Sequence, residues 1–371
     1  MRPRDRCFVA MAGLLLGCGL WGLVWSLPPP LAEKRALAAW PKAPSSWAGA
    51  CAWPKAFDLA WGEHYPWRWA WVALNANLRY RALGQGRWDW NVEGGSGVAV
   101  GGQRMLYLDT QGGRDAVTGR WRLDPAGRQA WIDFARAKAA LARRNHAVLM
   151  LALVPDKASV YPELRPWGWD QVGPSAIDQV QAALAREPEL LLVDLRPALA
   201  RAKDLCQAYS RVDTHWSPEG AAFAWQALAA AARRRWPGRD LPEARDPSSW
   251  GWYPWPLPHY GDLAGLLGLW PEPGEPGLRF PATPPGFDYS VLEKVRWDGP
   301  LGRGAPWLFY QDSYGHLLSY FPRLEGWSSR WDHYGTATEG SPLDQSMMDW
   351  ARPGVVVVEI AERALVNGPP R

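Results

Sequence analysis

Continuous apolar runs alternate with longer amphipathic segments over most of the chain. The runs are AVLMLALV at 147–154, LLLVDL at 190–195, APWLFY at 305–310 and PGVVVVEI at 353–360. Uninterrupted apolar stretches of this length are typical of strands that are buried on both faces, as in parallel sheets. The pattern therefore predicts strands at the centre of one sheet.

The segments between these runs predict helices with recognisable starts. Residues 124–146 form one, with Asp124 as its N-cap, and a second is expected around residues 175–186. Ser217 is placed to cap a third, PEGAAFAWQALAAAARRRW. Strands that alternate with helices predict an α/β fold with a mostly parallel sheet flanked by helices. Ligands of such sheets collect at the carboxyl ends of the strands.

The N-terminus predicts a membrane anchor. Residues 7–27, CFVAMAGLLLGCGLWGLVWSL, carry no charge and follow the basic start MRPRDR. This run is long enough to cross a bilayer as a helix, and its basic flank favours an N-terminus in the cytoplasm. No A-x-A cleavage site follows, so a signal anchor is favoured over a removed signal peptide. A lipoprotein cleavage box ending at Cys18 is a third alternative. The remainder is expected in the periplasm.

Beyond residues 1–27 the sequence divides into two further parts. Residues 28–95 are expected to form a stem rich in Pro, Ala and Trp, followed by a helical lead-in at 57–84. Residues 96–371 are expected to form the α/β domain. Near its start, GSGVAVGGQRMLYL predicts a β-hairpin, because two short β-prone runs flank a Gly-Gly pair.

Composition narrows the function classes. The chain of 371 residues has a net charge of +4 and no basic stripe, which argues against nucleic acid as a partner. Its 27 Trp residues reflect either a GC-rich genome or faces for stacking on sugars, and both explanations stay open. Cys51 and Cys206 fall in the exported part. They would form a disulfide only if their Cα atoms approach closely enough.

A candidate nucleophile and base stand at the ends of predicted elements. Ser313, in QDSYG, directly follows the run APWLFY and is predicted to open a helix, where free backbone N–H groups favour negative charge. His215, in RVDTHWSPEG, is a candidate base, and Asp213 is placed to orient its ring. Taken singly, a serine at such a junction is more often a helix cap than a nucleophile. A D-x-H segment alone is also consistent with part of a metal site or with a polar loop. Together they predict a Ser-His-Asp triad.

Several further segments carry a resemblance when they are taken in order. They are EKR at 33–35, GEHYPWR at 62–68, LVPDKASVYPE at 153–163, DTHWSPEGA at 213–221, GDLAGLLGL at 261–269, DSYG at 312–315 and VVVVEIAER at 355–363. In sequence and order they resemble the motifs of the alginate O-acetyltransferase family, whose members carry an SGNH-hydrolase-like domain. Asp and His precede Ser, which is the reverse of the order in ordinary SGNH esterases.

The resemblance implies an activity and partners. Ser313 corresponds to the nucleophile, His215 to the base and Asp213 to its orienting partner. The implied reaction moves an acetyl group through an acetyl-serine onto hydroxyls of an exported alginate-like or cellulose-like polysaccharide. No metal and no cofactor are implied. The implied partners are a membrane-bound O-acyltransferase as acetyl donor and other polysaccharide-export subunits.

Two departures and two rivals qualify the resemblance. Gln311 stands where the family carries the Gly of G-D-S. The sugar-binding positions are not matched, so Tyr320 and Arg330 are candidates for substrate binding from local spacing alone, beside the alternatives of a core aromatic and a surface arginine. An acetyl esterase with the same triad and a non-catalytic glycan-binding subunit are the alternative functions.

Overall fold

The computed structural model describes residues 38–64, 68–83, 97–110, 112–254, 261–269, 279–281, 296–297, 302–334 and 342–370. The predicted anchor at 7–27 lies outside these residues. Within them, no helix combines the length and apolar character that crossing a membrane requires. The chain separates into two compact units, Met1–Trp90 with Ala264–Pro273, and Asn91–Leu263 with Gly274–Arg371.

The described part of the first unit is mainly helical. Helix α2 spans Trp47–His64 and α3 spans Arg68–Leu78, which continues as a π-turn over Arg79–Leu83. The start of α2 lies inside the segment that composition assigns to the stem. On α2, aromatic rings one turn apart stack on each other, with 4.8 Å between the ring centroids of Trp53 and Phe57.

The second unit is built on a sheet in the order β4-β3-β10-β8-β9-β7. The first five strands are mutually parallel, and β7 is antiparallel to β9. The predicted mostly parallel α/β sheet is therefore confirmed. The strands are β3 (Val148–Val154), β4 (Leu190–Asp194), β7 (Arg296–Trp297), β8 (Arg303–Gln311), β9 (Trp327–His333) and β10 (Val355–Ala361). The small pairs β1 (Val98–Val100) with β2 (Leu106–Leu108), and β5 (Trp252–Pro254) with β6 (Arg279–Pro281), are antiparallel.

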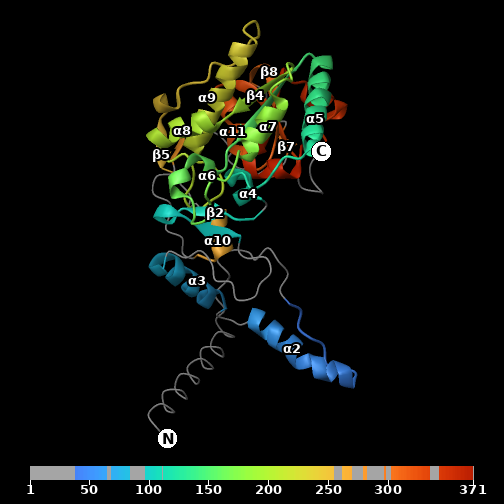
Figure 1. Ribbon diagram of the computed structural model, residues 1–371, viewed down its shortest axis with the longest axis vertical. Coiled ribbons are helices and arrows are strands. Elements are labelled where there is room, and N and C mark those ends of the chain that lie inside the picture. Colours follow the sequence, from blue (N-terminus) through green and yellow to red (C-terminus); the bar gives the residue numbers. More distant parts are fainter. Residues whose placement is uncertain are drawn as a thin grey trace. The chain divides into compact units, whose positions relative to one another are not determined.

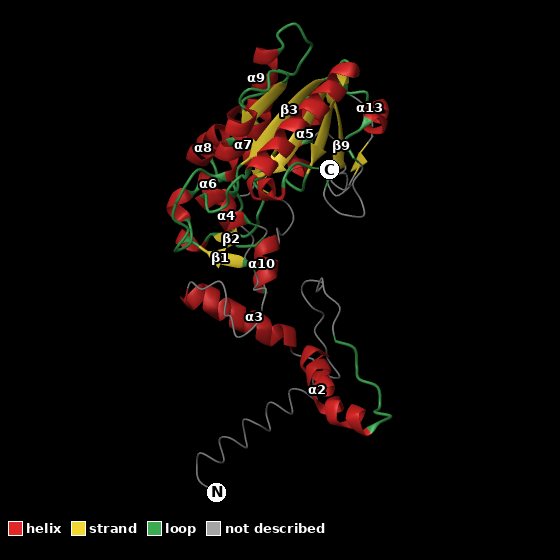
Figure 2. Cartoon of the chain, turned by 45° about the vertical axis from the view of Figure 1, so that its right-hand side comes forward, coloured by secondary structure: helices red, strands yellow, loops and turns green. Residues whose placement is uncertain are grey.

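Helices cover both faces of this sheet (Figures 1 and 2). The helices of this unit are α4 (Gly113–Thr118), α5 (Pro125–Arg144), α6 (Lys157–Val160), α7 (Ala176–Leu184), α8 (Arg196–Leu205), α9 (Pro218–Arg235), α11 (Gly315–Leu318), α12 (Phe321–Leu324) and α13 (Gln345–Ala351). Helix α10 (Asp262–Leu267) begins in this unit and continues into the first one. The predicted caps are in place: Asp124 Oδ1 accepts from the Gly127 amide at 2.6 Å, and Ser217 Oγ accepts from the Gly220 amide at 3.0 Å.

Two separate cores result from the alternation of side chains along the strands. Met150 and Val357 point to the face covered by α8 and α9. Their neighbours Leu149 and Val356 point to the face covered by α5, α7 and α13. Strands buried on both sides need apolar residues at every position, which explains the uninterrupted runs in the sequence. The two cores hold the carboxyl ends of β8 and β10 side by side, where the candidate site lies.

Candidate active site

Ser313 lies in an exposed turn just after β8. Asp312 fastens this turn to β10, because its amide donates to Glu359 Oε2 at 3.0 Å and its Oδ2 accepts from the Ala361 amide at 3.1 Å. Its Oδ1 accepts from the Tyr314 amide at 2.9 Å. The serine hydroxyl is therefore presented to solvent on a turn whose flanking residue is tied to the sheet.

The helix that follows this turn is short and does not begin at Ser313. Helix α11 begins at Gly315, two residues after Ser313, and has four residues. The Tyr314 amide, which would be free at a helix start, is used by the Asp312 carboxylate. The prediction that Ser313 opens a helix was therefore wrong. A helix dipole contributes little here, and stabilisation of an oxyanion has to come from individual donors.

Gln311 fits in place of the expected Gly because Gly315 has no side chain. Gln311 is fully buried. A Cβ on Gly315 would lie 2.4 Å from the Cβ, Cδ and Oε1 of Gln311, a separation that real Cβ atoms do not show. The two positions are coupled, and together they set the path of the chain on both sides of Ser313.

The loop that carries Asp213 and His215 is closed by an isolated antiparallel bridge between Tyr209 and Trp216. It runs directly into the N-cap of α9 at Ser217. Both ends of the loop are therefore anchored, so the two side chains between them have little freedom to separate.

The structure brings all three triad candidates together. Ser313 Oγ lies 2.8 Å from His215 Nε2, and Asp213 Oδ1 lies 2.6 Å from His215 Nδ1. Asp213 Oδ1 also accepts from the His215 amide at 2.9 Å. The Asp213 side chain is 9% exposed and that of His215 is 29% exposed, so the carboxylate is nearly buried and the imidazole is partly open to solvent. These contacts order a serine, a base and an acid as acyl transfer requires.

The electrostatics of the pair suit a base that gains a proton during reaction. Burial opposes ionisation of both groups, but their hydrogen bond and mutual attraction outweigh it. The pKa of Asp213 therefore falls below its ordinary value, and the pKa of His215 rises above its own. The carboxylate stays charged and stabilises the imidazolium.

Asp262, the acid of the GDLAGLLGL segment, completes the support of this loop. Its amide donates to Asp213 Oδ2 at 3.0 Å. Its own carboxylate accepts from the Thr214 amide at 2.7 Å and from the Thr214 hydroxyl at 2.6 Å. Gly261 permits this approach, since a Cβ there would meet the Val212 carbonyl oxygen at 2.1 Å.

A buried hydrogen-bond network joins the serine turn to the histidine loop. The Tyr314 hydroxyl donates to the Thr214 carbonyl at 2.7 Å. Arg363 Nη1 donates to that hydroxyl at 2.9 Å and to Asp156 Oδ1 at 2.7 Å. Trp216 Nε1 also donates to the Tyr314 carbonyl at 3.1 Å. Sequence reasoning assigned none of these contacts, and the E-R pair of VVVVEIAER was the available signal.

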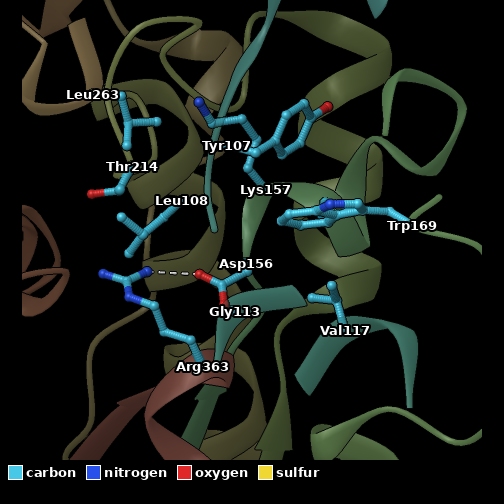
Figure 3. Close-up of a pocket in the computed structure, with 11 residues that line it drawn as sticks. Tyr107, Leu108, Gly113, Val117, Asp156, Lys157, Trp169, Thr214, Leu263 and Arg363 are labelled. Atoms are coloured by element: carbon cyan, nitrogen blue, oxygen red, sulfur yellow. Dashed lines mark hydrogen bonds and ion pairs between the residues drawn. The ribbon is translucent and has the colours of Figure 1, made fainter. Parts of the chain in front are cut away.

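Figure 3 shows the small pocket behind this network, with the Arg363–Asp156 pair on one side and Trp169 and Lys157 across from it. Its volume of about 20 Å³ holds about one water molecule, which is too little for a sugar. Lys157 Nζ donates to the Leu106 carbonyl at 2.8 Å. In this position Lys157 shapes the loop after β3.

Of the two substrate-binding candidates, Tyr320 is buried and Arg330 is partly exposed. Tyr320 has no exposed surface, and its ring packs against Phe321 at a centroid distance of 6.0 Å. Arg330, on β9, donates from Nη1 to the Trp350 carbonyl and stacks on that indole at 5.3 Å. Their assignment to substrate binding stays a prediction.

One cluster among the described residues has the composition of a metal site. It consists of Asp213, His215 and Asp262, whose possible ligand atoms all lie within 4.8 Å of one another. The two carboxylates and the imidazole of this cluster already form hydrogen bonds with each other and with Thr214. These bonds account for the cluster without an ion. Cys51 and Cys206 are free thiols.

The mostly parallel α/β sheet, with Ser313 after the carboxyl end of β8 and with Asp213 and His215 in the loop before α9, has the arrangement of an SGNH-hydrolase-like domain. Within that class, residues 119–285 match the family described as "SGNH hydrolase-like domain, acetyltransferase AlgX". Over these residues, which make up less than half of the chain, it is similar to the AlgJ/AlgX-like family.

Similar curated proteins carry the name "Probable alginate O-acetylase AlgJ". The one from Azotobacter vinelandii is 28% identical over 271 residues, covering 70% of this chain and 60% of the relative. The one from Pseudomonas aeruginosa is 30% identical over 239 residues, covering 62% of this chain and 53% of the relative. The chain thus spans about half to three fifths of the curated relatives it matches.

A solved structure with a similar fold is the O-acetyltransferase domain of Pseudomonas putida AlgJ. It has a TM-score of 0.47 and 22% identity over 73% of this chain and 92% of that one. The structure of Pseudomonas aeruginosa AlgX has a TM-score of 0.43 and 15% identity over 71% of this chain and 61% of that one.

Proposed function

We propose that this chain is a periplasmic O-acetyltransferase that acetylates hydroxyls of an exported polysaccharide through an acetyl-Ser313 intermediate. The observation that carries the proposal is the unbroken contact from Ser313 Oγ through His215 to Asp213, at 2.8 and 2.6 Å. The names of the similar curated proteins support the acetyl group and the polysaccharide acceptor.

The reaction has two balanced halves. Ser313 Oγ attacks the acetyl carbonyl while His215 Nε2 takes its proton, and the imidazolium then gives that proton to the leaving group of the donor. In the second half a sugar hydroxyl attacks the acetyl-serine. His215 takes the proton of this hydroxyl and returns it to Ser313 Oγ as the sugar ester leaves.

Covalent labelling tests this assignment. Phenylmethylsulfonyl fluoride is expected to add one sulfonyl group to Ser313, detected by intact-mass measurement and peptide mapping, and His215→Ala should slow the labelling. Ser45→Ala is the control, because Ser45 is exposed and lies in the other unit. Labelling that survives in Ser313→Ala at the wild-type rate would refute the nucleophile.

A second experiment distinguishes acetyl transfer to a sugar from hydrolysis of the acetyl-serine. The protein is loaded with acetyl from p-nitrophenyl acetate and supplied with an oligosaccharide. We expect acetylated sugar to exceed released acetate. Release of acetate alone would favour the esterase, and a protein that labels but never turns over would favour a glycan-binding subunit.

A further inference from the structure

A second groove lies on the α/β unit, beside the start of α9. It has a volume of about 360 Å³ and is lined by residues of α8, α9 and β5, with Arg279 from β6. Glu219 lines it from the first turn of α9, four residues after His215 along the chain. One residue of the groove lining therefore follows closely, along the chain, the loop that holds the candidate base.

Aromatic side chains form one wall of this groove. Trp250 and Trp252 lie nearly parallel, with ring centroids 6.0 Å apart and planes at 21°. Trp250 is braced from behind by the edge of Phe321 at 5.3 Å, and Trp252 Nε1 donates to the Pro247 carbonyl at 2.8 Å. Both indoles are partly exposed and are held in place, so they offer fixed apolar surface to a ligand.

A buried acid forms another part of the lining. The Glu219 side chain is 3% exposed, and its Oε1 accepts from Arg279 Nη2. Its Oε2 has no hydrogen-bond partner among the described residues, and the same holds for Trp250 Nε1. Burial raises the pKa of Glu219, although Arg279 works against this effect. Buried polar atoms without partners are uncommon in proteins and call for a ligand or water that satisfies them.

The charge of the lining selects between kinds of glycan. Glu219 and Arg279 pair with each other, so the described charged groups of the lining cancel. Of the two arginines next to the groove, Arg201 pairs with Asp246 at 3.1 Å, and Arg245 stacks on Trp250 at 5.8 Å and keeps its charge. Among the described residues that line the groove, no cation without an acidic partner is left for the carboxylate of a uronic acid.

We infer that the groove formed by Trp250, Trp252, Glu219 and Arg279 binds a short segment of a neutral polysaccharide. Apolar ring faces with a few fixed polar groups are the usual make-up of a small-molecule site, and pyranose rings match both features. The groove would hold the acceptor chain while one of its hydroxyls reaches Ser313. This inference rests on the proposed function for the identity of the acceptor, but binding itself does not require the triad.

Binding to the full-length protein tests the groove. Cellohexaose serves as the neutral probe and a mannuronate hexasaccharide as the acidic one, both measured by isothermal titration calorimetry. We expect cellohexaose to bind at least about ten-fold more tightly than the mannuronate probe, and Trp252→Ala to weaken cellohexaose binding by roughly ten-fold. Trp167→Ala is the matched control, because Trp167 is fully exposed and lies outside the groove. It should leave affinity unchanged.

A second variant keeps the test decisive if Trp252→Ala folds poorly. Glu219→Gln retains the volume and a hydrogen-bonding group but frees Arg279, so affinity for the mannuronate probe should rise while cellohexaose still binds. The inference is overturned if neither probe binds, if Trp252→Ala and Trp167→Ala bind alike, or if the wild type prefers mannuronate. Ser313→Ala should bind as the wild type does. If the wild type binds cellohexaose but is not labelled at Ser313, the proposed function is refuted and the inference about the groove is still supported.

Discussion

At the scale of single residues, Asp213 controls the charge of His215. Its carboxylate raises the pKa of His215, and acylation of Ser313 needs the neutral imidazole. The acylation rate with p-nitrophenyl acetate should therefore rise with pH through a midpoint above the ordinary histidine value of about 6.5. In Asp213→Asn the charge is lost, so the midpoint should move to lower pH and the plateau should fall by roughly 10²-fold or more.

The exposed Asp204→Asn is the control for this series and should match the wild type. A midpoint that stays in place when Asp213 is replaced would mean that another group sets the profile. Because the measurement follows Ser313 acylation alone, it does not depend on which polysaccharide is the acceptor.

Glu362 makes stability depend on pH. It is fully buried, accepts from the Asp156 amide at 3.1 Å and from the Ser159 hydroxyl at 2.6 Å, and burial with the nearby Asp156 charge raises its pKa to about 7. A raised carboxyl pKa means that the folded state holds the proton more tightly. Stability is therefore lost as pH rises from about 4.5 to about 7, by on the order of 3 kcal/mol at 1.36 kcal/mol per pKa unit.

Glu362→Gln should remove this loss, because the amide oxygen can still accept the bond from Asp156 and carries no charge. Urea denaturation at pH 5 and pH 8 measures the difference for wild type and variant. We expect the wild type to lose more stability between the two pH values. Parallel changes in the two proteins would show that Glu362 is already charged in the folded state.

At the scale of elements, the turn from β8 to α11 depends on a pair of positions. Gly315→Ala would place a Cβ 2.4 Å from the buried Gln311 side chain, so the chain around Ser313 has to shift. Overpacking of this kind costs about 1–3 kcal/mol and should also slow Ser313 labelling. Replacing Gln311 with Gly in the same chain should recover much of both losses.

Thermal unfolding and labelling of the two single variants and the double variant form a cycle that isolates this coupling. Gly238→Ala is the control, since a Cβ there meets nothing within 4 Å. Additive losses in the double variant would contradict the coupling.

Elements were predictable from the sequence where burial made them uniformly apolar. Strands β3, β8 and β10 follow from that rule, and β4 was predicted from its apolar run although it lies at the sheet edge and is mostly half-buried. Strand β9 was missed although it lies inside the sheet. Its Ser328, Ser329 and Asp332 are buried and polar, and hydrogen bonds make this possible, as in the Ser329 hydroxyl bond to the Ser319 carbonyl at 3.0 Å. A hydropathy pattern does not show which buried polar groups will find partners.

The same limit applies to the site. Ser313, His215 and Asp213 were named from local patterns, since each stands at the end of a predicted element or in a short motif. The contacts of Asp262, Tyr314 and Arg363 join segments that are far apart in sequence. Only the fold brings such residues together, so their positioning roles could not be derived from spacing.

At the scale of the whole molecule, the compartment that holds the α/β unit determines which acetyl donors the unit can reach. An anchor at residues 7–27 would hold the α/β unit in the periplasm, away from the cytoplasmic pool of acetyl-CoA, and the sequence contains no Gly-rich phosphate loop of G-x-x-x-x-G-K-S/T type. The acetyl group would then be handed over by a membrane-bound acyltransferase. Tethering beside that donor raises its effective concentration at Ser313.

The purified full-length protein should therefore take acetyl from p-nitrophenyl acetate and leave acetyl-CoA unused, as followed by mass measurement of acetyl-Ser313. In cells, deleting the acyltransferase should abolish polysaccharide acetylation even with Ser313 intact, and alkaline phosphatase fused after Arg371 should be active only if the fusion is exported. Acetylation of Ser313 from acetyl-CoA at a comparable rate would remove the need for the partner while leaving the triad in place. An inactive phosphatase fusion would instead place the unit in the cytoplasm, and both the donor and the exported acceptor would have to be given up.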